Sequence, residues 1–305
     1  FGTDGNLYVA EAGSGGDTES MGTCEGMTSM FAPYKIGMTA RVSVIDSTGS
    51  RVTAADNLPS AQDHYGDVLG VHDVAFINDT LYALVSGGGC SRGLADFPAS
   101  VIRVNEDGTT DIVADLSTYF ANNPTAAAAE EDYEPDGAAY AMVAHEGKLY
   151  VVNANHAAFE EISLDGSIRR VTDFSDSEGH VTPTAAIFHN GDFYVGTLGK
   201  FPIEQGASKV YRVGLDGSIE DYALGLTAVL GVAFDDQDRL YVLETSTVDG
   251  ELPIPGSGRV VRYGDGDEAE VIATGLTFPT GMTFASDGLL YVSHHGYGGD
   301  PAAGE

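Results

Sequence analysis

Cations are scarce in this chain. Across 305 residues, 14 lysines and arginines stand against 46 aspartates and glutamates, giving a formal net charge of −32. Nucleic acids and anionic membranes bind through clustered Lys and Arg, so we expect neither as a partner. The acidic residues are dispersed, which leaves two interpretations: a solvated surface adapted to salty water, or a surface that collects cations. Either surface is expected to destabilise the fold at low salt through self-repulsion.

Long apolar runs are also missing. No stretch of 18 apolar residues occurs, so no membrane-spanning helix is predicted. Hydrophobic residues still make up 43% of the chain, and its length allows a large core in one or two domains. The chain opens inside a repeated phrase, which fits either a removed leader or an incompletely known sequence.

Only two cysteines are present, Cys24 and Cys90, each in a Gly-rich loop. Two cysteines alone cannot form a structural zinc site. In an exported protein they would pair, closing a loop of about 65 residues that contributes roughly 4 kcal/mol in the chain-entropy model. Free thiols are the alternative.

Several chemical motifs are absent as well. The chain has no Gly-x-Ser-x-Gly elbow, no phosphate loop, no His-Glu-x-x-His and no haem-type cysteine motif, which disfavours serine-nucleophile hydrolysis and nucleotide chemistry. The Asp-Gly pairs beginning at 107, 165, 216 and 287 lack the full calcium-loop pattern of an EF-hand, so we interpret them as turns.

What the chain does contain is a repeat. Six copies of an apolar segment, a tight Asp/Asn/Gly turn and a Leu-Tyr-Val-like strand recur, and this period indicates a repeat architecture. The repeat tyrosines are Tyr8, Tyr82, Tyr150, Tyr194, Tyr241 and Tyr291. Each copy predicts a hairpin, and a second hairpin follows in five copies. Four antiparallel strands per unit predict an all-β, six-bladed β-propeller in one domain, residues 1–305, with blades beginning near residues 1, 72, 140, 184, 230 and 280.

The two ends of the chain and its longest loops carry further expectations. The first unit lacks most of its innermost strand and the sixth stops before its second hairpin, so we expect the propeller to be clipped at both ring-closing ends. Long insertions are expected at residues 12–40, 86–98 and 120–137. All three should emerge on one face, because each follows a second strand or joins two blades, and such decorated loops commonly carry binding sites.

The order of segments along nearly the whole chain resembles the ScyD/ScyE family of exported, NHL-like six-bladed propellers. The matching stretches are Asp4–Gly13, Val71–Phe76, Ala114–Leu116, Asn122–Pro124, Gly199–Pro202, Val210–Val213, Gly275–Gly281 and Ala303–Glu305. The resemblance implies the fold and export to a secreted, extracellular or periplasmic location, and it implies no particular reaction. Gluconolactonase-like propellers are similar more distantly, without a residue-by-residue match that transfers their ligands.

Candidate site residues lie where first strands begin and second strands end, since both meet at the decorated mouth. His72 is the candidate general base, because imidazole titrates near neutral pH. Tyr140, Asn153 and Thr280 are candidate ligand-binding residues. Glu11, Glu244 and His294 are candidate ligands for a divalent metal such as calcium. Polar residues at such a mouth can equally be solvated or can cap backbone groups.

Two functions therefore stay open. The first is binding of a small ligand or divalent metal at the mouth, with hydrolase- or lyase-type activity, which needs a concave converging polar site. The second is a non-catalytic protein-interaction or surface-assembly module, which needs an exposed patch. Met21, Met27, Met30, Phe31 and Tyr34 in the first insertion are candidates for that patch.

Overall fold

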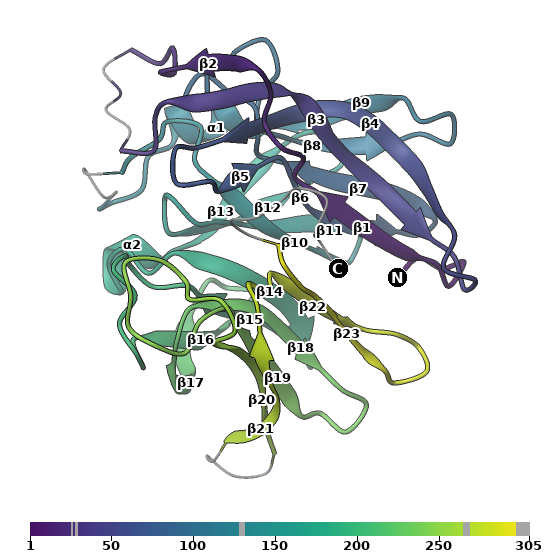
Figure 1. Ribbon diagram of the computed structural model, residues 1–305, viewed down its shortest axis with the longest axis vertical. Coiled ribbons are helices and arrows are strands. Elements are labelled where there is room, and N and C mark those ends of the chain that lie inside the picture. The colour runs from purple at the N-terminus through teal and green to yellow at the C-terminus, as the bar shows by residue number, and fades with distance from the viewer. Residues whose placement is uncertain (26, 28–29, 128–131, 265–268, 297–305) are drawn as a thin grey trace. The chain divides into compact units, whose positions relative to one another are not determined.

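The computed structural model describes residues 1–25, 27, 30–127, 132–264 and 269–296 (Figure 1). These residues separate into two compact units, 1–177 and 178–305, and each is described by itself. The single-domain expectation therefore stays a prediction. Within the described residues, no helix is both long enough and apolar enough to cross a bilayer.

The first unit consists of three antiparallel sheets. Its elements are β1 (Leu7–Glu11), β2 (Thr18–Ser20), β3 (Tyr34–Ile45), β4 (Arg51–Gln62), β5 (Val68–Leu69), β6 (Val71–Ile77), β7 (Thr80–Val85), β8 (Ser100–Val104), β9 (Thr110–Asp115), α1 (Leu116–Asn122), β10 (Ala139–His145), β11 (Lys148–Asn153), β12 (Ala158–Ile162), β13 (Ile168–Asp173) and α2 (Phe174–Ser177). One sheet has the order β1-β3-β4-β5 with β2 beside β3, and the others run β6-β7-β8-β9 and β10-β11-β12-β13.

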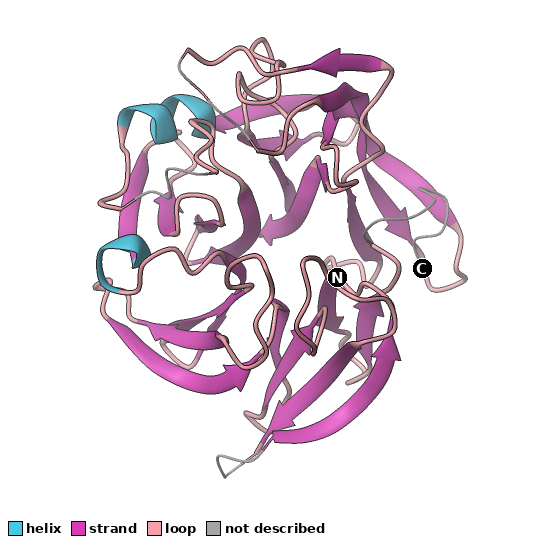
Figure 2. Ribbon diagram, turned by 60° about the vertical axis from the view of Figure 1, so that its left-hand side comes forward, coloured by secondary structure: helices cyan, strands magenta, loops and turns pink. Residues whose placement is uncertain are grey.

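The second unit repeats the same up-and-down order. Its elements are β14 (Pro183–His189), β15 (Asp192–Thr197), β16 (Ser208–Val213), β17 (Ile219–Leu226), β18 (Val229–Phe234), β19 (Leu240–Glu244), β20 (Gly258–Tyr263), β21 (Ala269–Leu276), β22 (Gly281–Phe284) and β23 (Leu290–Ser293). They form the sheets β14-β15-β16-β17, β18-β19-β20-β21 and β22-β23. Figure 2 shows the strands of both units in magenta, joined by short turns and longer loops.

The repeat predicted these hairpins well. All six repeat tyrosines lie on the predicted second strands, namely β1, β7, β11, β15, β19 and β23. Five second hairpins are present, ending in β4, β9, β13, β17 and β21. In the predicted Asp-Gly turns the aspartate carboxylate accepts the backbone N–H of the residue two positions later. Thr109 N donates to Asp107, and Ser218 N donates to Asp216. These turns therefore satisfy their own backbone, as turn chemistry requires.

Two details differ from the sequence-based expectation. The first insertion is shorter than predicted, because β3 already begins at Tyr34, and it contains the short strand β2. Among the described residues the structure has two short helices, α1 and α2, which the all-β prediction did not include. Helix α1 begins behind Asp115, whose carboxylate accepts the N–H of Thr118, an N-cap that a search for helical periodicity does not detect.

Apolar side chains fill the spaces between neighbouring sheets. Leu84 and Val101 of one sheet pack with Leu149 and Val151 of the next, and all four are almost fully buried. In the second unit, Val210 packs in the same way with Val242. The sheet β6-β7-β8-β9 buries both of its faces, one in each of two apolar clusters, and hydrophobic burial is expected to dominate the stability of such sheets.

One carboxyl group is buried in the first unit without a complete set of partners. The Glu160 side chain on β12 has no exposed surface, and its Oε1 lies 3.4 Å from Arg170 Nε while Oε2 has no partner. Burial raises the pKa of Glu160 to about 8, opposed by Arg170. Between pH 4.5 and 8, Glu160 therefore keeps its proton in the folded protein, whereas in the unfolded chain it loses that proton near the ordinary glutamate pKa of 4.5.

We expect the unfolding free energy to fall by about 2 kcal/mol between pH 6.5 and 8, because there the folded state binds one more proton at Glu160 than the unfolded state. His72 and His156, with pKa values lowered to about 4, contribute in the opposite direction, and only below about 6.5. Urea titrations at several pH values measure the slope of the unfolding free energy against pH. Glu160→Gln should abolish this slope between pH 6.5 and 8.

Glu161→Gln is the matched control. Burial raises the pKa of Glu161, but the hydrogen bonds and ion pairs with Arg169 and Lys148 and the hydrogen bond from Tyr150 together outweigh burial and lower the pKa to about 2. Its stabilising contribution is lost only as the pH falls below about 4.5, so this variant should keep the slope above pH 6.5. Equal slopes in the wild type and Glu160→Gln would contradict the assignment.

Candidate functional site

The three long insertions of the first unit are tied together. Cys24, in the insertion that follows β1, forms a disulfide with Cys90, in the insertion that follows β7, as predicted. Ser91 N donates to the Asp136 carboxylate, which lies in the connection between α1 and β10, and Asp136 N donates back to Ser91 Oγ. These contacts confirm that the insertions of the first unit emerge together.

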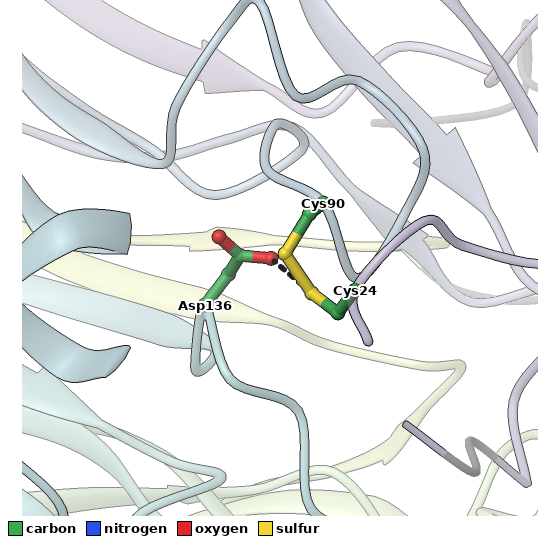
Figure 3. A group of neighbouring side chains, drawn as sticks. All are labelled: Cys24, Cys90 and Asp136. Carbon is green, nitrogen blue, oxygen red and sulfur yellow. Dashed lines mark hydrogen bonds between the residues drawn. A yellow bond between two sulfur atoms is a disulfide. The ribbon is translucent and has the colours of Figure 1, made fainter. Parts of the chain in front are cut away.

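Figure 3 shows the Asp136 carboxylate against the disulfide, with Oδ2 3.6 Å from Cys24 Sγ. Cys24, Cys90 and Asp136 are the one group of three metal-ligand atoms found among the described residues. Both sulfur atoms are bonded to each other, and metals bind thiolates rather than disulfides. This group therefore does not fit a metal centre while the bridge is intact.

Beside the bridge lies a buried ion pair. The Arg92 side chain is fully buried, and its Nη2 donates to Glu134 Oε2 and, at 2.7 Å, to the carbonyl of Gly137. Tyr34 Oη donates to the other carboxylate oxygen of Glu134. Burial raises the pKa of Glu134, and Arg92 and Tyr34 hold it down. Removing either charge would strand the other away from water.

Glycine is needed at two backbone positions of this region. A Cβ on Gly89 would lie 2.3 Å from Asp136 Cγ, and one on Gly137 would lie 2.4 Å from Asn153 Nδ2. Both residues also have positive φ, +98° and +63°. Any side chain would collide with the polar groups that these loops bring together, so the glycines permit the close approach.

Asn153, the predicted ligand-binding residue at the end of β11, organises the connection that carries Glu134. Its Oδ1 accepts the N–H groups of Ala138 and His156. His156 Nε2 in turn lies 2.8 Å from the Glu134 carbonyl oxygen. Asn153 Nδ2 is buried and has no partner. Arg92 donates to the carbonyl of Gly137 and the Asn153 amide lies beside Gly137, so both side chains pack against the same short segment of backbone.

His72 and Tyr140 lie near the starts of β6 and β10, which pack side by side. Their ring centroids are 4.7 Å apart in an edge-on contact. Burial lowers the pKa of His72 to about 4, and the nearby Arg92 charge adds to the shift. Burial also raises the pKa of Tyr140, with Asp67 contributing. Both side chains are therefore neutral at pH 7. The sequence does not reveal this desolvation, and the role of His72 as a general base stays a prediction.

These residues define the Arg92 cluster: Tyr34, His72, Arg92, Glu134, Tyr140 and Asn153. The cluster contains three of the sequence-predicted site residues, His72, Tyr140 and Asn153. Arg92 and Glu134 were missed. Two features of the sequence could have indicated them. Arg92 directly follows the Gly-rich loop that contains Cys90, and Glu134 lies in the acidic third insertion.

An open cavity adjoins the cluster. It has a volume of about 370 Å³, and Tyr34, which donates to Glu134, is one of its lining residues. Asp63, His64 and Tyr65 line the same cavity. A small molecule would therefore find a recess next to the buried polar groups.

The predicted metal ligands each have protein partners. Glu11 at the end of β1 pairs with Arg41 and Arg51, and Glu244 at the end of β19 pairs with Arg259. Glu244 Oε1 also accepts Thr227 N at 2.7 Å. In the second unit, His294 Nε2 lies 2.6 Å from Thr277 N, and Thr280 Oγ1 lies 3.0 Å from Ser293 Oγ. The metal and ligand roles of these residues stay predictions.

The Glu244 carboxylate is already paired with Arg259 and is therefore not expected to bind calcium. We expect millimolar calcium to change the melting temperature equally in the wild type and in Glu244→Gln. Differential scanning fluorimetry at constant ionic strength makes the comparison, with the exposed Glu251→Gln as a control for lost charge. A calcium stabilisation lost only in Glu244→Gln would instead assign the cation to this residue.

The predicted apolar patch of the first insertion is only partly present. Met21 and Met30 are 68% and 50% exposed, whereas Tyr34 is 1% exposed. Including Tyr34 in the patch was wrong, because its hydroxyl turns inward to Glu134.

Comparison with known proteins identifies the fold. No protein family and no curated protein matches the sequence. Among solved structures, the chain is similar to a nidogen/laminin complex component at TM-score 0.56 and 12% identity, covering 86% of this chain and 84% of the other. It is similar to an inactive virginiamycin B lyase of Staphylococcus aureus at TM-score 0.53 and 11% identity, covering 96% and 97%. It is also similar to regucalcin, a calcium-binding protein of Agrobacterium tumefaciens, at TM-score 0.50 and 12% identity, covering 74% and 68%. The chain has an all-β propeller fold with four-stranded antiparallel blades.

Proposed function

We propose that this chain is an exported β-propeller that binds a small polar molecule at the Arg92 cluster, with hydrolase- or lyase-type chemistry on the bound molecule. The single observation that carries the proposal is a set of buried polar atoms without partners on three neighbouring side chains, Arg92, Asn153 and His72. Native proteins leave few such groups unpaired, so an occupant is expected.

The neutral state of His72 supports chemistry. His72 is half-buried and neutral at pH 7, so its buried, unpaired Nε2 can accept a proton or a hydrogen bond, and Tyr140 keeps its proton and can donate a hydrogen bond. The similarity to a lyase makes the class of reaction reasonable, although fold alone does not imply function. Export is supported by the disulfide. We further propose that β22–β23 is the first hairpin of a sixth blade, in line with the ScyD/ScyE resemblance.

The experiment is a thermal-shift and turnover screen with small lactones and esters. Tyr140→Phe removes one hydroxyl and Asn153→Ala removes the amide, so both should weaken binding and turnover. Tyr222→Phe, at an exposed position on β17, and Asn105→Ala, in an exposed loop, are the matched controls. Binding that all four variants retain would place the site elsewhere.

The alternative is a non-catalytic interaction or surface-assembly module. It is favoured by the exposed Met21 and Met30 of the first insertion. Met21→Ser/Met30→Ser should then abolish self-association or partner binding in analytical ultracentrifugation while leaving ligand shifts unchanged. Unchanged association would remove the support for this alternative.

A further inference from the structure

We propose that the molecule bound at the Arg92 cluster carries a carboxylate, recognised by the buried N–H groups of Arg92 and Asn153. The inference rests on the proposed function and names the chemical class of its ligand. The inference depends on the kind of atom left unpaired in the cluster. An unpaired hydrogen-bond donor can be satisfied only by a ligand that carries an acceptor, and an unpaired acceptor only by a ligand that carries a donor.

The unpaired atoms of Arg92 and Asn153 are all donors. A guanidinium has five N–H groups, and Arg92 uses the two on Nη2 for Glu134 and Gly137. Its Nε and Nη1 are buried without partners, which leaves three N–H groups. Asn153 Nδ2 adds two more.

The side-chain oxygens of Glu134 and Asn153, and Oδ2 of Asp136, already accept hydrogen bonds from other groups. Both carboxylate oxygens of Glu134 accept hydrogen bonds, one from Tyr34 and one from Arg92. Asp136 Oδ2 accepts the Ser91 N–H. Asn153 Oδ1 accepts two backbone N–H groups. A ligand that satisfies the unpaired N–H groups of Arg92 and Asn153 must therefore bring its own acceptor oxygens, which a bare metal ion does not carry.

A carboxylate fits this donor set better than a neutral carbonyl. Hydrogen bonds between a guanidinium and a carboxylate are roughly twice as strong as neutral ones. Arg92 and Glu134 already balance each other as an ion pair, and His72 is neutral at pH 7, so the guanidinium is the group of this cluster that would attract an anion. Ordered water is the competing occupant, since it can also satisfy buried donors.

The test observes Arg92 itself by NMR. The probes are acetate, glycolate and benzoate, each compared with its neutral amide at constant ionic strength and pH 7. We expect the carboxylates to shift the Arg92 Nε–H resonance in a saturable way, and the amides to leave it in place. The resonance is assigned by its disappearance in Arg92→Lys. Exposed Arg103 reports any general effect of the salts.

Asn153→Ala should weaken the carboxylates about tenfold or more, because a hydrogen bond to a charged group contributes roughly 1.5–3 kcal/mol. Asn105→Ala should leave their affinity unchanged. If Arg92→Lys does not fold, the Asn153 side-chain amide resonance, assigned by its loss in Asn153→Ala, gives the same readout.

Three results would overturn the inference: no shift with any carboxylate, equal shifts with the amides, or equal shifts at Arg103. The first of these is the outcome expected of a water-filled cluster. Failure of the proposed function is distinguishable. Lactones that bind in a Tyr140-dependent way without moving Arg92 would keep the function and refute the carboxylate, whereas carboxylate binding without turnover of any ester or lactone would do the reverse.

Discussion

Cys24→Ser/Cys90→Ser should unfold at lower denaturant concentration than the wild type, with a loss of about 4 kcal/mol in the first unit. The bridge spans a sequence separation of 66 residues, and closing a loop of that size removes about 4 kcal/mol of chain entropy from the unfolded state. For a unit of this size we expect a melting temperature lower by roughly 8–16 °C. The sheets should persist, because their apolar packing does not involve the bridge.

Reductant provides the control for this prediction. Treating the wild type with a strong thiol reductant should reproduce the loss, and the double variant should be insensitive to the same treatment. Calorimetry with and without reductant measures both. A wild type that melts at the same temperature after complete reduction would show that the bridge positions the insertions without stabilising them.

The variant also tests how far the bridge supports the Arg92 cluster. The insertion that carries Arg92 remains held by the Ser91–Asp136 hydrogen bonds after the sulfur link is lost. The shift of the Arg92 Nε–H with carboxylates should therefore survive, with lower affinity.

The fold was predictable because each hairpin of the repeat can be identified from a short, contiguous stretch of sequence. An apolar strand, a tight turn and a Leu-Tyr-Val-like strand indicate a hairpin without any information about distant residues. The pairing of Cys24 with Cys90 was predictable for a different reason, since two cysteines allow only one bridge. Boundaries were less accurate where loops intervene, as at β3, because strand pairing with β4 extends further than the apolar pattern suggests.

The site was only partly predictable. Strand ends follow from the repeat, which is why the sequence could place His72, Tyr140 and Asn153 at the ends of β6, β10 and β11. Their role in binding stays a prediction. Arg92 and Glu134 lie 42 residues apart in two insertions, and nothing in either loop encodes their contact. The sequence likewise hid the arginine partners of Glu11 and Glu244, which come from neighbouring strands of the same sheets.

Arg92→Met should destabilise the first unit by about 3–5 kcal/mol, because it leaves the Glu134 charge buried without a counterion. Glu134→Gln should cost a similar amount by stranding the guanidinium. The double variant should be much less destabilised than the sum of the two, since it removes both charges together. Urea unfolding of all four proteins gives the coupling energy directly.

The exposed pair Arg103–Asp111 on β8 and β9 is the matched control within the same unit, with side chains 49% and 54% exposed. Its coupling energy should stay below about 1 kcal/mol, because water already solvates both charges. Similar coupling in the two pairs would mean that water reaches Arg92. In that case its unpaired N–H groups would be hydrated, and the donor-based argument for a carboxylate ligand would lose its foundation. A large coupling at Arg92 alone would instead establish the dry, donor-rich site from which the ligand class is inferred.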